Sequence, residues 1–141
     1  MRFVLDNSVT MRWLFGDGGV EDLAYANGVL DAMEIRQAQA VVPSLWALEV
    51  ANVIQRAEAR GFLTEARSTE FIGLLQQMAI IADTETSRHA LGDTLQLARR
   101  HKLSAYDAAY LELALREGLP LATLDADLRK ATEASGAPLM Q

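Results

Sequence analysis

The sequence predicts an α/β fold, namely an open, doubly wound parallel sheet of four or five short strands flanked by helices. Three observations lead to this prediction. Short runs of almost wholly apolar residues recur along the chain, longer segments with apolar residues at helical spacing lie between them, and glycine or proline stands at several of the boundaries. Apolar strands that alternate with helices are typical of a parallel sheet covered on both faces.

Four apolar runs are the predicted strands, and a fifth run near the C-terminus is a shorter candidate. The four strands are expected at residues 3–5, 40–43, 79–82 and 120–124, and the fifth at 138–140. Pro43 closes the second strand, because proline cannot donate a hydrogen bond to a neighbouring strand.

Helical periodicity predicts seven helices between and after these strands. They are expected at residues 8–15, 20–36, 45–60, 64–78, 86–101, 105–117 and 126–135. Gly61 and Gly118 stand just past two of them, where glycine commonly ends a helix. Gly92 should weaken the helix at 86–101, since glycine is a poor helix former.

Composition limits the class of protein. A chain of 141 residues, half of them hydrophobic, fits one domain spanning residues 1–141. It contains no cysteine, so disulfides and thiolate metal sites are excluded. The absence of cysteine is compatible with a protein of a reducing compartment. No segment approaches the roughly 20 apolar residues of a membrane span. We therefore expect a cytoplasmic protein with no membrane partner.

The net charge of −6 argues against a protein that binds nucleic acid through a broad basic face. Any such binding must be local. The available cations are the cluster at 99–102 and the scattered Arg12, Arg56 and Arg60. Arg12 lies one turn after Ser8 on the first predicted helix and is the candidate contact to a substrate phosphate. The alternative is that each of these cations lies on a solvated helix face.

Four acids stand out by their position. Asp6 and Asp125 each follow a predicted strand, whereas Glu49 and Asp107 are lone acids among apolar residues on predicted helices. In open α/β sheets, ligands bind beyond the carboxyl ends of the strands. The four carboxylates are therefore candidates for one shared site.

Three of the four acids also have an ordinary structural explanation, helix capping. Asp6 is a suitable cap for the helix that follows it, and Asp107 fits a capping box with Ser104. At the fourth position Asp125 and Asp127 compete, and either is a suitable cap for the last helix. We favour Asp125 because it follows the strand directly, with Asp127 as the substitute.

Glu49 is harder to explain by helix capping. Its neighbours one turn away are mostly apolar and include no basic residue. A buried acid in that position needs a counter-ion from elsewhere. Asn52, one turn further on, is either an amide that orients Glu49 or a metal-bound water, or a surface or helix-contact amide.

A cluster of carboxylates needs a cation. Two carboxylates about 4 Å apart repel by roughly 4 kcal/mol at an effective dielectric constant near 20. Oxygen ligands without cysteine or a suitably placed histidine favour hard cations, so the expected cofactor is Mg²⁺, with Mn²⁺ as the substitute. Such sites bind phosphate oxygens and activate water for attack on a phosphodiester.

The sequence around these acids resembles a PIN domain, and more narrowly a VapC-type toxin of a bacterial type II toxin–antitoxin system. The resemblance spans nearly the whole chain, and residues 104–114 are its most specific part. The motifs that carry it are Phe3-Val4-Leu5-Asp6-Asn7-Ser8, Leu48-Glu49-Val50-Ala51-Asn52, Ser104-Ala105-Tyr106-Asp107-Ala108-Ala109-Tyr110-Leu111-Glu112-Leu113-Ala114 and Leu121-Ala122-Thr123-Leu124-Asp125.

The resemblance implies a magnesium-dependent endoribonuclease that cleaves RNA and acts as a toxin. It places Asp6, Glu49, Asp107 and Asp125 around the ion, with the hydroxyl of Ser8 or Thr123 assisting. It also implies a small antitoxin protein that lies across the active-site groove, and a homodimer.

Two other functions remain open from the sequence. In a haloacid-dehalogenase-type phosphatase, a strand-end aspartate belongs to an Asp-x-Asp-x-Thr motif. Asp6 and Thr10 match it, but Ser8 replaces the middle acid. The other alternative is a catalytically inactive PIN-like interaction module, which would keep the fold and bind no magnesium or manganese.

Overall fold

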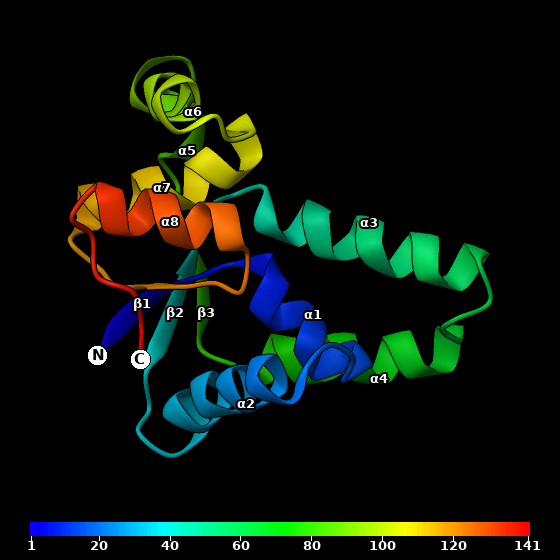
Figure 1. The fold of residues 1–141 in the computed structure, drawn as a ribbon. Helices are drawn as coiled ribbons and strands as arrows, with labels where there is room; N and C mark the ends of the chain where they lie inside the picture. The colour runs from blue at the N-terminus through cyan, green and yellow to red at the C-terminus, as the bar shows by residue number, and fades with distance from the viewer.

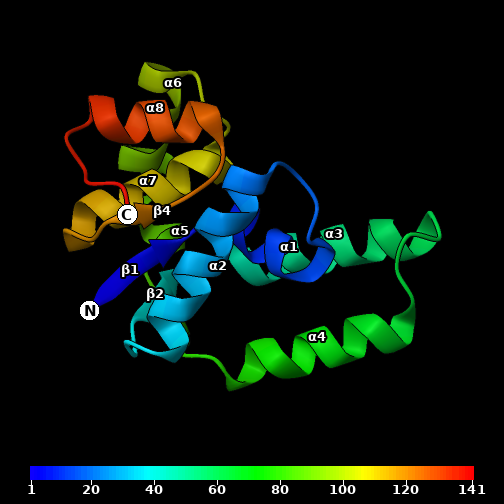
Figure 2. The same cartoon turned by 60° about the horizontal axis from the view of Figure 1, so that its bottom comes forward.

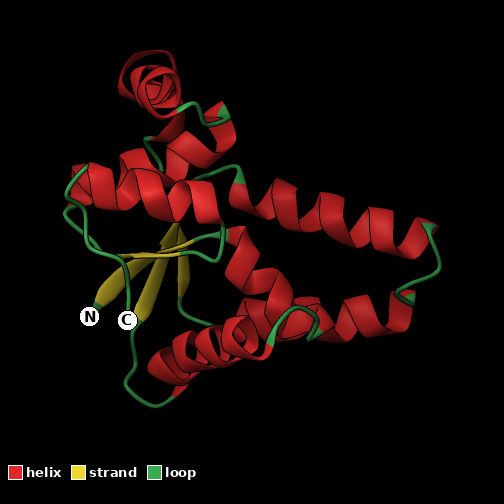
Figure 3. Ribbon diagram, in the orientation of Figure 1, coloured by secondary structure: helices red, strands yellow, loops and turns green.

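A four-stranded parallel sheet with helices on both faces forms the centre of the molecule, as Figures 1 and 3 show for the computed structural model of residues 1–141. The strands are β1 (Arg2–Leu5), β2 (Gln39–Val42), β3 (Ile80–Ala82) and β4 (Leu121–Ala122), in the spatial order β3-β2-β1-β4. All three strand pairs are parallel. The predicted α/β fold class is confirmed.

Helices form each connection between successive strands. Most of them lie within two residues of the predicted ranges. They are α1 (Asn7–Phe15), α2 (Val20–Glu34), α3 (Trp46–Ala59), α4 (Glu65–Gln77), α5 (Thr86–His89), α6 (Leu95–His101), α7 (Ala105–Glu117) and α8 (Ala126–Ala134). None of them is both long enough and apolar enough to cross a membrane.

Alternate residues of the strands build two separate cores. Phe3 and Leu5 of β1 face α1 and α2, where they pack with Val9 and Val29. Val4, between them, faces the opposite way and packs with residues of α7 and α8. Because side chains of a strand alternate between its faces, an all-apolar strand such as β1 must be buried on both.

Helices α3 and α4 form a hairpin that projects away from the sheet (Figures 1 and 2). A third apolar cluster joins this hairpin to α1. In it, Met11 and Leu14 of α1 meet Val50 and Ile54 of α3 and Phe71 of α4. Helix α1 therefore lies beside α3, with its opposite side on the sheet.

The structure corrects two predicted strands. Strand β4 covers only residues 121–122 instead of 120–124, so Asp125 lies three residues past its end and does not follow it directly. Residues 138–140 contribute only one isolated bridge, between Leu121 and Leu139.

The predicted helix at 86–101 is broken into three parts. A five-residue π-helical segment, η1 (Ala90–Thr94), separates α5 from α6. Gly92 has non-helical backbone angles inside it (φ −110°, ψ −106°). The glycine expected to weaken this helix therefore interrupts it, since glycine tolerates a conformation that other residues avoid.

Candidate active site

The four predicted acids lie where helices begin beyond the sheet. Asp6 is the single residue between β1 and α1, and Asp125 directly precedes α8. Glu49 and Asp107 lie in the first turns of α3 and α7. The positive end of each helix dipole therefore points toward an acid, which favours negative charge at that place.

Asp6 is the most buried acid of the four, with 5% of its surface exposed. Its Oδ2 atom accepts hydrogen bonds from the hydroxyls of Ser8 (2.6 Å) and Thr123 (2.7 Å). Its side chain makes no capping bond to α1. Burial raises the pKa of Asp6, although the two hydroxyl hydrogen bonds act in the opposite direction. The hydroxyls of Ser8 and Thr123 thus fix the orientation of the Asp6 carboxylate, which does not cap α1.

The same two hydroxyls hold the loop after β4 against α1. Ser8 Oγ accepts a hydrogen bond from the backbone N–H of Leu124 (2.9 Å), and Thr123 Oγ1 accepts one from that of Asp125 (3.1 Å). Ser8 and Thr123 therefore position both Asp6 and the segment that carries Asp125.

Asp125 caps α8 and also belongs electrostatically to the cluster. Its Oδ1 atom accepts a hydrogen bond from the backbone N–H of Leu128 (2.8 Å). Its charge raises the pKa of both Asp6 and Asp107, whereas Asp127, which is exposed on α8, acts on Asp107 alone and more weakly. These interactions favour Asp125 over Asp127 as the fourth acid.

Asp107 lies at the third position of α7, where the sequence predicted a capping box. Ser104 Oγ accepts a hydrogen bond from the backbone N–H of Asp107 (3.1 Å). Burial, together with the charges of Asp6 and Asp125, raises the pKa of Asp107 to about 6. No basic side chain forms an ion pair with Asp107. The carboxylate is therefore costly to ionise in the folded chain as it stands.

Glu49 is held by a residue that the sequence did not single out. The hydroxyl of Tyr110, which is fully buried on α7, donates a hydrogen bond to Glu49 Oε1. Burial raises the pKa of Glu49, the Tyr110 bond lowers it, and the charges of Asp6 and Asp107 raise it further. Asn52, the residue proposed to orient Glu49, is exposed and makes no side-chain hydrogen bond. The available signal for Tyr110 was its spacing, three residues after Asp107 on one helix face.

Removal of the Tyr110 hydroxyl should loosen Glu49. We expect Tyr110→Phe to weaken Mn²⁺ binding, measured by calorimetry, by about tenfold, the lower range for groups that orient metal ligands. Ser68→Ala is the matched control, because the Ser68 hydroxyl also donates a hydrogen bond to a carboxylate, that of Glu58, which is not one of the four acids. Equal Mn²⁺ affinity in both variants would contradict the role of Tyr110.

Arg12, the candidate phosphate contact, lies in the last turn of α1. Its Nη1 atom forms an ion pair with Asp17 (2.9 Å), and its side chain is 27% exposed. The backbone of Gly18 lies against the guanidinium, so that a Cβ atom there would come within 2.9 Å of Arg12 Nε. Arg12 is thus partly engaged within the chain, and its contact with a phosphate stays a prediction.

The chemistry of the acid cluster fits a hard divalent cation. All four side chains offer only oxygen, and none of them is neutralised by a basic side chain. Beside Asp6, the Oδ1 atom of Asn7 is buried and has no hydrogen-bond partner. No three acids converge on one point at ligand distance in this arrangement. The positive charge of a bound cation would offset the mutual repulsion of the carboxylates.

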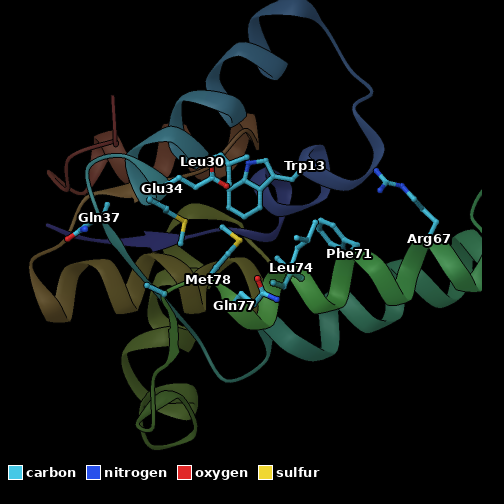
Figure 4. A pocket seen from close by; sticks show the side chains of 13 residues that line it. Trp13, Leu30, Glu34, Gln37, Arg67, Phe71, Leu74, Gln77 and Met78 are labelled. Carbon is cyan, nitrogen blue, oxygen red and sulfur yellow. The ribbon is translucent and has the colours of Figure 1, made fainter.

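An apolar cavity lies apart from these acids. It is a cavity of about 500 Å³ between α2 and α4, lined mainly by apolar side chains such as Trp13, Leu30 and Phe71 (Figure 4). None of the four acids lines it. The cavity therefore offers an apolar surface rather than a catalytic centre.

Comparison with known proteins decides the family. A sequence model described as the PIN domain matches residues 3–134 of this chain. The chain belongs to the PIN domain family. This match covers residues 3–5 of β1, all four acids and helix α8, so the predicted resemblance to a PIN domain is confirmed over nearly the whole length.

This PIN domain also resembles a named relative in sequence. Ribonuclease VapC3 of Pyrobaculum aerophilum is 34% identical over 84 residues, which are 60% of this chain and 64% of that protein. The chain therefore matches slightly less than two thirds of the length of that relative.

Solved structures share the fold of this PIN domain. A structure of VapBC2 from Rickettsia felis, bound to a DNA fragment from their promoter, has a TM-score of 0.67 at 10% identity and covers 100% of this chain and 98% of that one. A structure of FitAcB from Neisseria gonorrhoeae has a TM-score of 0.60 at 16% identity and covers 100% and 97%. At these identities the likeness concerns the fold.

Proposed function

We propose that this PIN domain is a divalent-metal-dependent endoribonuclease, with Mg²⁺ or Mn²⁺ as its cofactor, and that it acts as the toxin of a toxin–antitoxin pair. The observation that supports this most strongly is the electrostatic coupling of Asp6, Glu49, Asp107 and Asp125 without any basic partner. The sequence likeness to a ribonuclease of the VapC type supports the substrate class.

Each residue of the proposed site has a separate role. Asp6, Glu49, Asp107 and Asp125 would hold the cation. When bound, the cation supplies positive charge to the phosphodiester oxygens and lowers the pKa of a water molecule. Ser8 and Thr123 fix the orientation of Asp6, as the two hydrogen bonds to its Oδ2 atom indicate.

Glu49 and Asp107 are only half buried, so the face of the cluster that they form is open to a substrate. Hydrolysis needs both the attacking water and the scissile phosphate to reach the acids from solvent. The half-buried pair provides this access, whereas Asp6 is deeply buried. This arrangement supports a site that acts on an external phosphodiester.

A cleavage assay tests the proposed activity. Total bacterial RNA is incubated with the purified protein, in magnesium or in chelator, beside Asp6→Asn prepared identically. We expect discrete RNA fragments only for the wild-type chain with magnesium. Asp31→Asn is the matched control, because Asp31 is an exposed acid on α2, and it should cleave like wild type. Cleavage that survives chelation or the loss of Asp6 would refute the proposal.

Metal binding gives a second test that does not depend on a substrate. A ligand that binds only the folded state stabilises it, by about 2.7 kcal/mol at one hundred times its Kd. We expect Mg²⁺ or Mn²⁺ to raise the melting temperature of the wild-type chain by several degrees. The same titration should leave Asp6→Asn nearly unchanged. An unchanged melting temperature of the wild type would favour the inactive interaction module.

An antitoxin partner belongs to the same proposal. The cavity between α2 and α4 is lined mainly by apolar side chains, and an amphipathic helix can pack its apolar face into a groove of this kind. The fold shared with VapBC2 supports a partner protein, and we propose that the pair acts in the cytoplasm, where RNA is available.

A homodimer is the remaining part of the proposal. Strand β3 lies at the edge of the sheet, and Ile81 on it is 46% exposed. Nearby, Trp46, Ile54, Ile72 and Ile80 line an apolar hollow between α3, α4 and β3. Such an uncovered edge is a usual place for chains to associate, which supports self-association.

A further inference from the structure

A hollow at the far end of α3 combines aromatic and basic side chains. It has a volume of about 490 Å³ and lies between the end of α1, the second half of α3 and the turn that follows α3. Phe15 and Phe62 contribute two rings, and Arg56 and Arg60 two guanidinium groups. Phe62 is 76% exposed, although a large apolar side chain is normally buried.

The charge of this hollow differs from that of the rest of the chain. Arg56 and Arg60 are exposed and form no ion pair. The only acid in the lining, Asp17, is already paired with Arg12 at 2.9 Å. The hollow is therefore a local basic site on a protein whose net charge is −6. Such a site attracts an anionic ligand to this place.

The hollow and the acid cluster share one face of α3. Glu49, Arg56 and Arg60 are spaced by seven and eleven residues, and both intervals bring a side chain back to nearly the same side of a helix. At 1.5 Å per residue, Arg56 lies about 10 Å and Arg60 about 16 Å along the axis from Glu49. Helix α1 runs beside this part of α3 (Figure 2). A chain-like ligand that reaches Glu49 can therefore continue along α3 into the hollow.

We propose that this hollow binds a single-stranded segment of the RNA substrate beside the scissile phosphate, an inference that rests on the proposed function. Arg56 and Arg60 hold backbone phosphates, and a base stacks on the exposed ring of Phe62. Proteins bind single-stranded RNA by this combination of cations and aromatic rings, because unpaired bases expose their faces for stacking. The two free guanidinium groups favour a polyanion over an apolar protein segment.

Binding to a labelled RNA tests the proposal. The probe is a fluorescein-labelled single-stranded RNA of twelve mixed nucleotides, measured by anisotropy against protein that carries Asp107→Asn to prevent cleavage. We expect Arg56→Gln with Arg60→Gln to weaken binding by about tenfold or more. The slope of log affinity against log salt should fall by about 1.4, since each phosphate contact to a single strand contributes about 0.7. Arg36→Gln with Arg88→Gln removes the same charge from exposed sites elsewhere and should change neither.

Phe62→Ala separates stacking from charge. We expect it to weaken binding of the single strand by about fivefold or more with an unchanged salt slope, because stacking does not release counterions. Its affinity for a duplex of the same sequence should stay the same, since paired bases cannot stack on the ring. Both sets of variants should melt within about two degrees of their parent, which excludes unfolding as the cause.

The outcomes distinguish this inference from the proposed function. If the wild-type chain cleaves RNA with magnesium but the double arginine variant binds RNA like its control, the inference is overturned and the proposed function stands. If binding falls as expected but the wild type cleaves nothing, the RNA site stands and the proposed activity fails. If RNA binding is unaffected and only binding of a partner protein is lost, the hollow is a protein interface and the inference is overturned.

Discussion

Asp107→Asn should abolish metal-dependent cleavage and at the same time stabilise the metal-free protein. Loss of one proposed carboxylate ligand would remove several kcal/mol of charge stabilisation, so we expect a decrease in rate on the order of a thousandfold. The gain in stability follows from the raised pKa of Asp107, which is about 6 in the folded chain. A substitution that lowers activity while it raises stability is typical of a residue retained for function.

The pH dependence of this gain has a defined sign. The carboxyl of Asp107 binds its proton more tightly in the folded chain than in the unfolded chain, where its pKa has the ordinary value of 3.8. Stability therefore falls as the pH rises from about 4 to about 6 and stays lowered above that range. Asparagine has no charge to bury, so the melting temperature of Asp107→Asn should equal that of wild type near pH 4 and exceed it by a few degrees above pH 7.

Thermal unfolding with and without Mg²⁺ measures both effects. In chelator the variant should be the more stable protein, whereas saturating Mg²⁺ should reverse the order, because only the wild type gains from the ion. Asp93→Asn, at an exposed acid on η1, is the control and should follow the wild type in both conditions. If Asp107→Asn is less stable than wild type in chelator at pH 7.5, burial and the neighbouring acids do not destabilise the charged form of Asp107.

Arg116→Met should produce the largest loss of stability. Arg116 of α7 pairs with Asp83 (2.7 Å) and with Glu112 (2.8 Å), whose side chains are only 7% and 5% exposed. Removing one member of a buried ion network leaves uncompensated charge, which costs about 3 to 5 kcal/mol. Urea unfolding measures this loss. Arg67→Met removes an exposed arginine 3.8 Å from Glu70 and should cost less than about 1 kcal/mol.

A further variant shows whether unpaired charge is the cause. Replacing Asp83 and Glu112 with leucine in the Arg116→Met background should recover most of the lost stability, since an apolar cluster can replace a buried ion network. Burial raises the pKa of Asp83, but the hydrogen bonds from Arg116 and Thr86 outweigh it, so that its pKa lies below the ordinary value. The network therefore stabilises wild type above pH 4 and weakens as the pH falls below it. No recovery in the triple variant would contradict this explanation.

Asp83 shows where reasoning from the sequence was incomplete. It follows a strand, as Asp6 does, and this local pattern predicts only a cap for the next turn. The structure places it in an ion pair with Arg116, 33 residues away, in addition to its bond from Thr86. Two acids with the same local pattern thus have different environments. One is neutralised by an arginine and the other is surrounded by further acids.

The alternation of strands and helices, and the positions of Asp6, Glu49 and Asp107 relative to them, could be predicted from the sequence alone, whereas Asp125 lies three residues past β4 and does not follow it directly. Apolar periodicity and helix-ending glycines are local, and Gly118 indeed ends α7 in the left-handed conformation (φ 64°) that glycine favours. The order of the strands, the broken helix around Gly92 and the shortness of β4 required the structure. Each of these depends on how distant elements pack against one another.

For the candidate site, the sequence determined which acids have no local basic partner, and only the tertiary structure decided which groups orient them. Thr123 bonds Asp6 across 117 residues, and Tyr110 bonds Glu49 across 61. The pattern of charge and hydrophobicity is encoded locally along the chain. A hydrogen bond between distant side chains exists only once the sheet and helices have docked, because docking alone fixes their separation and direction.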